Sequence, residues 1–164
     1  MNKLFRANFN FLNIAIIFLI AIFFSLDRYL KHVAINLDNG VSLPLISNFF
    51  SFSFAQNNNI AFSLPINTSF LLPIIIIAIS LLLFAIIWDI SKNRSLTINA
   101  SLLTFILFGA ISNMLDRFQY GFVIDYLSLK NFSIFNLADI MIALASLFYI
   151  ILYYKMNKKN RRNE

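Results

Sequence analysis

Residues 70–88 read FLLPIIIIAISLLLFAIIW, an uncharged run long enough to cross a lipid bilayer as one helix. A helix rises about 1.5 Å per residue, so about 20 apolar residues cross the roughly 30 Å hydrocarbon layer. The run closes a longer stretch, residues 39–88, that contains no charged side chain. A water-exposed fold needs charges on its surface, so this stretch predicts a protein with lipid as its solvent for much of its length.

The rest of the sequence supports a membrane protein with four spans. Of 164 residues, 60% are hydrophobic and only 12% are charged, and the mean hydropathy is +0.78. Three further apolar runs, residues 9–26, 96–115 and 136–154, are each near the length of one span. No small-residue cleavage site follows the first run, which indicates a signal anchor rather than a removed signal peptide. We therefore expect a single integral membrane domain over residues 1–164.

The placement of the charges predicts how the chain crosses the membrane. Cytoplasmic segments of membrane proteins carry an excess of Lys and Arg. Net positive charge falls on the N-terminal segment, on the link between spans two and three, and on a basic tail, residues 155–164. The other two links have no net charge. Both termini are therefore expected in the cytoplasm, and the neutral links at the extracytoplasmic face of the cell inner membrane.

The composition excludes several kinds of partner and site. The formal net charge of +6 lies at the ends of the spans, so it indicates contact of the tail with membrane lipid rather than a nucleic-acid partner. The chain has no cysteine, which excludes disulfides, thiol nucleophiles and thiolate metal sites. Its single histidine, His32, excludes a histidine-based zinc site. We expect no metal and no cofactor.

The first neutral link, residues 27–69, is too long and too apolar for a plain connector. Its segments 41–46, 49–54 and 60–66 are rich in β-formers and are separated by proline and asparagine. We expect a small, strongly curved sheet against the membrane, either a platform for an extended peptide or a lid over the helices. The predicted fold is a membrane all-α protein with four transmembrane helices plus a curved extracytoplasmic β-sheet platform between helices one and two.

The acidic residues gather on the predicted extracytoplasmic side, and one of them lies inside a span. A carboxylate near the centre of a span costs about 2.5–3.5 kcal/mol on insertion scales, and less near an end. Asn136 is a good N-cap, which would place Asp139 in the first turn of a helix, where the dipole favours its ionised form. A function is therefore the first hypothesis for Asp139. The acidic residues on this side are Asp27, Asp38, Asp116, Asp125 and Asp139.

Asp125 is the candidate partner of Asp139. It lies 14 residues earlier, before a turn-like segment at 128–133, so a re-entrant link could return it to the same depth. Two carboxylates in a poorly hydrated site share one proton, and the pair can then activate water as base and donate to a carbonyl as acid. Such a pair hydrolyses a peptide without metal or cofactor. Helix caps or ion pairs are the alternative for the other acids, with Arg117 available to Asp116 or Asp125.

Three sequence blocks near the end of the chain, with two nearer its start, resemble prolipoprotein signal peptidase, also called signal peptidase II. The late blocks are NMLDR at 113–117, YGFVIDY at 120–126 and FNLAD at 135–139. The early blocks are DRYLK at 27–31, similar to an Asp and Lys pair of the family, and NNNIAFS at 57–63, similar to its Asn-x-Gly-x-Ala-Phe-Ser segment. The resemblance covers nearly the whole chain and includes the four-span topology.

The resemblance implies an aspartyl protease that cleaves prolipoproteins just before their diacylglyceryl-modified cysteine. Its catalytic dyad would be Asp125 and Asp139, and Asp27 and Lys31 would stabilise the outer end of the fold. Further residues would support the site or hold the substrate, with Asp116 as a motif residue outside the dyad. These residues are Asn57, Asn113, Asp116, Arg117 and Asn136.

The chain departs from the family at four positions. Asn59 replaces a glycine and is the residue type most tolerant of the same turn. Phe108 and Ser112 replace glycines before Asn113, which concerns the packing of span three. Tyr126 stands where phenylalanine is common.

Three other functions remain as alternatives. A serine and lysine dyad would use Lys31 with Ser25 or Ser63. A proton-coupled transporter would use Asp139 as its relay, but residues 140–144 read IMIAL and offer no polar path toward the cytoplasm. A non-catalytic membrane subunit would use the carboxylates only to pair with arginines.

Overall fold

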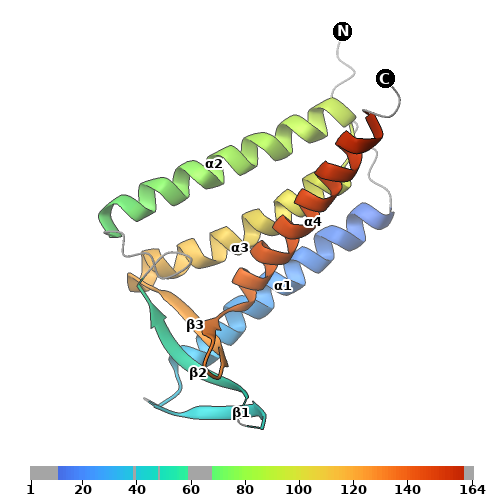
Figure 1. Cartoon of the computed structure of the whole chain (residues 1–164). Coiled ribbons are helices and arrows are strands. Elements are labelled where there is room, and N and C mark those ends of the chain that lie inside the picture. Colours follow the sequence, from blue (N-terminus) through green and yellow to red (C-terminus); the bar gives the residue numbers. More distant parts are fainter. Residues whose placement is uncertain (1–10, 39, 48, 59–67, 161–164) are drawn as a thin grey trace.

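The computed structural model describes residues 11–38, 40–47, 49–58 and 68–160. These residues form four long helices with a four-stranded antiparallel sheet at one end (Figure 1). The predicted fold class is confirmed, since four helices are long and apolar enough to cross a membrane. The elements are α1 (Phe11–Ile35), β1 (Ser42–Ile46), β2 (Phe50–Asn57), α2 (Thr68–Asn93), α3 (Ile98–Tyr120), β3 (Val123–Leu129), β4 (Ser133–Phe135) and α4 (Leu137–Asn160).

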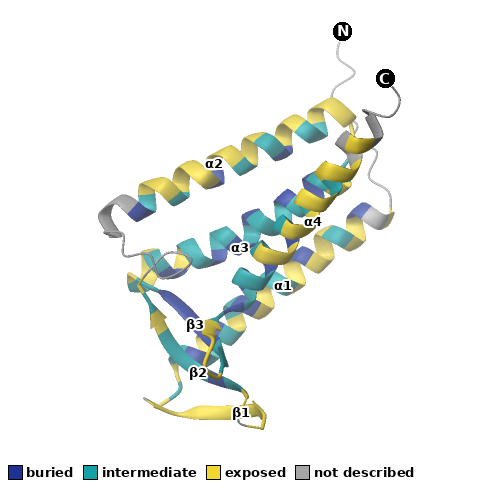
Figure 2. Ribbon diagram, viewed as in Figure 1, coloured by how far each residue is buried: buried dark blue, intermediate teal, exposed yellow. Residues whose placement is uncertain are grey.

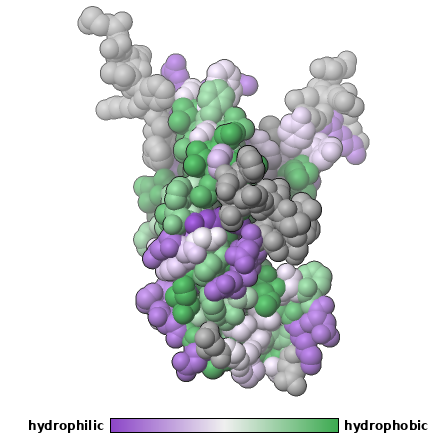
Figure 3. Space-filling view, turned by 90° about the vertical axis from the view of Figure 1, so that its left-hand side faces the viewer, coloured by the Kyte–Doolittle hydropathy of each residue, from purple (hydrophilic) through white to green (hydrophobic). Residues whose placement is uncertain are grey.

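Helix α3 lies at the centre and packs against each of the other three helices. In its most apolar segment 33% of the residues are buried, against 17% in each of the other helices. Most of the surface of α2 is exposed and apolar (Figure 2). Exposed apolar surface of this extent requires lipid to cover it. Figure 3 shows hydrophilic residues mainly around the sheet and near the far ends of the helices.

Helix α1 extends beyond the predicted span, which was placed at residues 9–26. It continues to Ile35 and carries Asp27 and Lys31, both fully buried. The difference has a physical cause. Hydropathy treats these charges as the end of the span, whereas the folded chain pairs them inside the protein.

The sheet is built from two parts of the chain, although only the first was predicted. Strands β1 and β2 come from the link after α1, and the hairpin of β3 and β4 comes from the link between α3 and α4, in the order β1-β2-β3-β4. The expected turn at 128–133 is the tip of this hairpin, with Asn131 at φ +60°. Residues 123–126 are all buried, so β3 lacks the alternation that marks a half-exposed strand.

Helices α3 and α4 approach each other closely at Gly109. A Cβ at this position would lie 2.8 Å from the carbonyl oxygen of Ala138, so a larger residue would require the helices to move. The two departures ahead of Asn113 are accommodated on either side of this contact. Phe108 packs edge-on against Phe24, and Ser112 is buried among polar groups of α1.

Several predictions concern residues outside the described ranges. They are the β-forming segment 60–66, Asn59, Ser63, the N-terminal basic residues and the end of the basic tail beyond residue 160.

Candidate active site

A groove of about 1490 Å³ opens where α2, α3 and α4 meet the sheet. Its walls are apolar where Leu71, Ile75 and Ile142 face it, and its sheet end is polar. Five of the residues predicted for the site line it, from four different elements. They are Asn57, Asn113, Arg117, Asp125 and Asp139.

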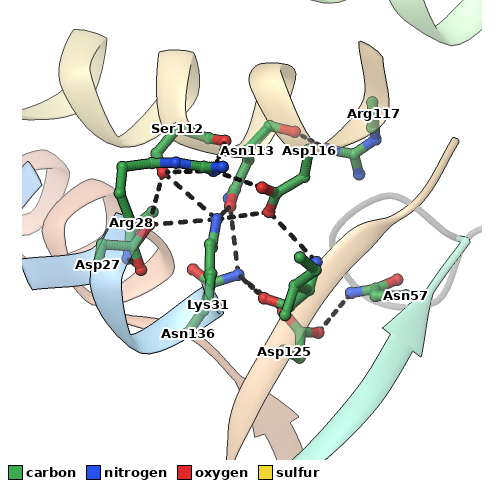
Figure 4. A network of polar contacts seen from close by, with 12 residues as sticks. Asp27, Arg28, Lys31, Asn57, Ser112, Asn113, Asp116, Arg117, Asp125 and Asn136 are labelled. Carbon is green, nitrogen blue, oxygen red and sulfur yellow. Dashed lines mark hydrogen bonds and ion pairs between the residues drawn. The ribbon is translucent and has the colours of Figure 1, made fainter. Parts of the chain in front are cut away.

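Asp125 is held in the groove by two asparagine side chains (Figure 4). Asn57 Nδ2 donates to Asp125 Oδ2 at 2.8 Å, and Asn136 Nδ2 donates to Asp125 Oδ1 at 2.7 Å. Asn57 pairs with Val123 across the sheet, so Asp125 is its diagonal neighbour on the same face. An irregularity in the β2–β3 register between Phe52 and Ala55 precedes this pair. Both carboxylate oxygens of Asp125 therefore have a fixed direction.

Asp139 lies in the first turn of α4, as the sequence predicted. The backbone N–H of Asp139 donates to Asn136 Oδ1 at 2.9 Å, and the backbone N–H of Asn136 donates to Asp139 Oδ2 at 3.2 Å. This reciprocal pair is a capping box, with Asp139 in the acidic position. Asn113 Nδ2 from α3 donates to the other oxygen, Oδ1, at 2.8 Å. The carboxylate is thus oriented by both helices.

Asn136 joins the two aspartates through one fully buried side chain. Its amide oxygen accepts from the backbone N–H of Asp139, and its amide nitrogen donates to the carboxylate of Asp125, so one side chain connects the two aspartate residues. Burial, together with the negative charge of Asp139, raises the pKa of Asp125 to about 6 against the opposing hydrogen bonds from Asn57 and Asn136. One carboxyl group of the pair can therefore hold a proton near neutral pH while the other is ionised.

Behind the groove, charged side chains from α1 and α3 form a buried ion cluster. Lys31 Nζ lies 3.2 Å from Asp27 Oδ2 and 2.8 Å from Asp116 Oδ2, and all three side chains are fully buried. Arg28 forms an ion pair with Asp116 and also donates to the carbonyl oxygen of Ser112 at 3.2 Å. The cluster balances two carboxylates with two cations, as burial of charge requires.

The ion cluster orients the groups that hold Asp125 and Asp139. Lys31 Nζ donates to Asn113 Oδ1 at 2.7 Å, and because an ammonium only donates, the amide nitrogen of Asn113 must face Asp139. Asp116 Oδ2 accepts from the backbone N–H of Ile124, next to Asp125, at 3.2 Å. Both aspartates are thus supported from behind by one cluster.

The ion pair expected between Arg117 and Asp116 needs correction. Arg117 was considered as the partner of Asp116, but Asp116 pairs with Arg28 and Lys31 instead. The side chain of Arg117 lines the groove, where its Nη1 donates to the Asn113 carbonyl oxygen at 3.5 Å. Asp27 and Lys31 are both buried in the ion cluster, and their expected role in stabilising the outer end of the fold stays a prediction.

The geometry disfavours a serine and lysine dyad. Lys31 is fully buried, and its ammonium group is engaged by the carboxylates of Asp27 and Asp116 rather than by a candidate serine nucleophile. Ser25, the one candidate nucleophile within the described residues, is exposed.

Sequence reasoning did not assign a site role to Ser112 or Tyr126. Ser112 Oγ donates to Asp27 Oδ2 at 2.5 Å, and the Tyr126 hydroxyl donates to Asp27 Oδ1 at 2.9 Å. Both positions were recognised only as departures from a family pattern, and that signal does not identify a hydrogen-bond partner.

Metal ligands are not grouped in the part of the chain that the structure describes. Within those ranges, no three Asp, Glu, His or Cys side chains lie together as ligands of one ion would. The carboxylates near the groove are held by amide, ammonium, guanidinium, hydroxyl and backbone donors. These groups donate hydrogen bonds to carboxylate oxygens and are not metal ligands.

Comparisons with known proteins agree with this architecture. A family model described as signal peptidase (SPase) II matches residues 19–155. The lipoprotein signal peptidase of Clostridium tetani is 35% identical over 137 residues, which cover 79% of this chain and 86% of that protein. That of Fusobacterium nucleatum is 34% identical over 149 residues, covering 88% and 89% respectively.

A solved structure has the same fold. A bacterial membrane enzyme determined by the in meso method at 2.3 Å resolution aligns with a TM-score of 0.75 at 22% identity, covering 92% of this chain and 93% of that one. The length of the family match and the identity to these relatives confirm the resemblance noted in the sequence. The chain belongs to the signal peptidase II family.

Proposed function

We propose that this chain is an aspartic endopeptidase that removes the signal peptide from diacylglyceryl-modified prolipoproteins. It cleaves before the lipid-modified cysteine, with Asp125 and Asp139 activating a water molecule. The observation that carries the proposal is that Asn136 donates to both carboxylates, through its side chain to Asp125 and through its backbone N–H to Asp139. Both aspartates line one groove. The lipoprotein signal peptidases that resemble the chain support the choice of substrate.

The reaction needs one proton on the pair of aspartates. The ionised carboxylate takes a proton from water as the oxygen attacks the scissile carbonyl carbon, and the other carboxyl group donates its proton to the carbonyl oxygen. The tetrahedral intermediate then collapses and the C–N bond breaks. The leaving amine receives a proton from one carboxyl group, while the other, ionised carboxylate takes a proton from a hydroxyl group of the intermediate. Water is consumed, a carboxyl and an amine are formed, and the dyad regains its starting protonation.

The shape of the groove fits a substrate that is part membrane helix and part extended peptide. Its apolar wall, with Leu71, Ile75 and Ile142, suits a lipid-embedded segment. Its polar end reaches the β3–β4 hairpin, whose exposed strand β4 leads directly to Asn136. The sheet therefore serves as a platform for the peptide next to the dyad, by strand addition or by side-chain contacts.

The proposed reaction also assigns an orientation. Lys92, Arg94, Lys155 and Lys158 lie at the ends of the helices away from the sheet, whereas the two aspartates lie in β3 and at the start of α4, next to the sheet. We place both termini in the cytoplasm and the groove at the extracytoplasmic face of the inner membrane. Contact with membrane lipid follows from the exposed apolar surface of the helices.

The proposal is tested with purified protein in detergent and a diacylglyceryl-modified prolipoprotein. The variants are Asp125→Asn and Asp139→Asn, with Asp38→Asn as the matched control because Asp38 is exposed and outside the groove. Asparagine keeps the shape but cannot exchange the proton. Each dyad variant should lose at least about 100-fold in cleavage rate, whereas the control should keep the parental rate.

A precursor without the diacylglyceryl group tests the substrate assignment in the same assay. It should be cleaved much more slowly than the modified precursor. Full activity of folded Asp125→Asn or Asp139→Asn would show that the aspartates are structural. An inactive parent protein would return attention to the transporter and subunit alternatives.

A further inference from the structure

Tyr126 follows Asp125 directly in β3, and its side chain points to the opposite face of the strand. It is fully buried and packs against Phe52, with ring centroids 5.4 Å apart. The surrounding residues are apolar, and they include Ala34 and Ile124. A buried phenol in such a core needs partners for its hydroxyl group.

The hydroxyl group connects two elements that are far apart in the sequence. It donates to Asp27 Oδ1 in α1 at 2.9 Å and accepts from the backbone N–H of Leu137 in α4 at 3.0 Å. Burial and the nearby Asp27 carboxylate raise the pKa of Tyr126 well above its ordinary value. The hydroxyl therefore keeps its proton and stays a donor throughout the accessible pH range.

The start of α4 depends on side chains from three elements. The first N–H groups of a helix have no partner within the helix. Here Leu137 N–H goes to Tyr126, Ala138 N–H goes to Asp27 Oδ1 at 3.1 Å, and Asp139 N–H goes to Asn136. The position of the first turn is therefore set by these three acceptors.

The hydroxyl lies between the two backbone segments that carry the aspartates. Asp125 is one residue before Tyr126 in β3, and Asp139 is two residues after Leu137 in α4. We propose that Tyr126 is a positioning residue: by tying β3 to the first turn of α4, its hydroxyl fixes the separation of the two carboxylates. The inference rests on the proposed function, because only a shared proton and a shared substrate make that separation matter.

A purely structural role would affect stability and nothing else. Tyr126→Phe keeps the ring in the core but leaves the Leu137 N–H without its acceptor. Tyr120→Phe is the matched control, since Tyr120 packs against the same core and its ring contacts Phe122, while no hydrogen bond of its hydroxyl is seen within the described residues. Tyr120→Phe shows the effect of losing a hydroxyl group from this core. Tyr126→Phe loses, in addition, the acceptor for the Leu137 N–H.

The experiment measures kcat, KM, the pH dependence of kcat/KM and the thermal unfolding of parent and variants in detergent. Tyr126→Phe should lower kcat about 10-fold at a temperature where it is fully folded, with KM within about 2-fold, as expected for loss of one hydrogen bond that acts through geometry. The pH above which kcat/KM falls should move downward, because separated carboxylates share a proton less strongly. Tyr120→Phe should match the parent in all three.

A second variant keeps the proposal testable if Tyr126→Phe does not fold. With 4-aminophenylalanine at position 126, the amine still donates to Asp27 but accepts poorly from Leu137, so stability should recover while kcat stays below the parental value. Parental kcat and pH dependence in either folded variant, or a change confined to KM, would overturn the inference alone. An inactive parent would overturn the proposed function and the inference with it.

Discussion

Replacing Gly109 by alanine should push α3 and α4 apart next to the dyad. The new Cβ would lie 2.8 Å from the Ala138 carbonyl oxygen and 2.8 Å from Ile142 Cγ1, whereas ordinary contacts of a Cβ begin at 3.4 Å. Helix α4 must therefore move by about 0.6 Å. The hydrogen bond from Asn113 to Asp139, now 2.8 Å, would lengthen to about 3.4 Å, beyond a good hydrogen bond.

The expected loss is larger for activity than for stability. Overpacking costs about 1–3 kcal/mol, and the better helix propensity of alanine returns about 1 kcal/mol. The free energy of unfolding should therefore fall by no more than about 2 kcal/mol. Because a misplacement of about 1 Å can cost 100-fold in rate, a shift of this size should lower kcat about 10-fold.

The assay is cleavage of the modified precursor at a temperature where thermal unfolding shows both proteins fully folded. Gly40→Ala is the control, since Gly40 has no atom within 4 Å of the added Cβ and lies away from the groove. The control carries backbone strain at φ +83° but should keep the parental kcat. Parental kcat in folded Gly109→Ala would refute the claim that this close approach positions the aspartates.

Three further perturbations have defined outcomes. The kcat/KM of the parent should fall as pH rises through about 6, where Asp125 loses its proton. Asn57→Ala removes a hydrogen bond that favours the ionised form, so it should move this fall to higher pH by no more than about 1 unit. A move of the fall to lower pH would contradict this. Lys31→Met leaves two buried carboxylates without their shared cation and should destabilise the protein by about 3–5 kcal/mol. The unfolding temperature should therefore be much lower, and an unchanged unfolding temperature would argue against the ion cluster. Thr97→Ala removes the side-chain acceptor for Ala100 N–H at the far end of α3 and should cost about 1 kcal/mol in unfolding with kcat unchanged; a large drop in kcat would mean that the far end of α3 affects the site.

The sequence was sufficient to predict the four helices and to single out two aspartates that line one groove, although their catalytic role stays a prediction. A long uncharged run in lipid forms a helix, because a helix satisfies its own backbone hydrogen bonds, so the four helices can be predicted from composition. Asn136 and Asp139 follow the pattern of a helix start, and the structure has that capping box. The meeting of Asp125 with Asp139 needed only a link that returns to the same depth, which the β3–β4 hairpin provides.

The parts that were missed depend on contacts between distant segments. Strand β3 is covered on both faces, so its sequence shows no alternation and its pairing with β2 cannot be read locally. The charges near the end of α1 resemble the end of a span because hydropathy contains no information about Asp116, about 90 residues later. The role of Gly109 depends on the position of the Ala138 carbonyl oxygen, which only the folded chain defines.

The buried ion cluster also imposes an order of assembly as the chain leaves the ribosome. Helix α1 enters the membrane carrying Asp27, Arg28 and Lys31, one more positive than negative charge, and the compensating Asp116 arrives only with α3. The first turn of α4 then needs Asp27 as an acceptor, so α4 makes a contact with α1 that can form only after all four helices have been synthesised. A chain that stops before α4 lacks Asp139 and leaves Asp27 without the backbone donor of Ala138.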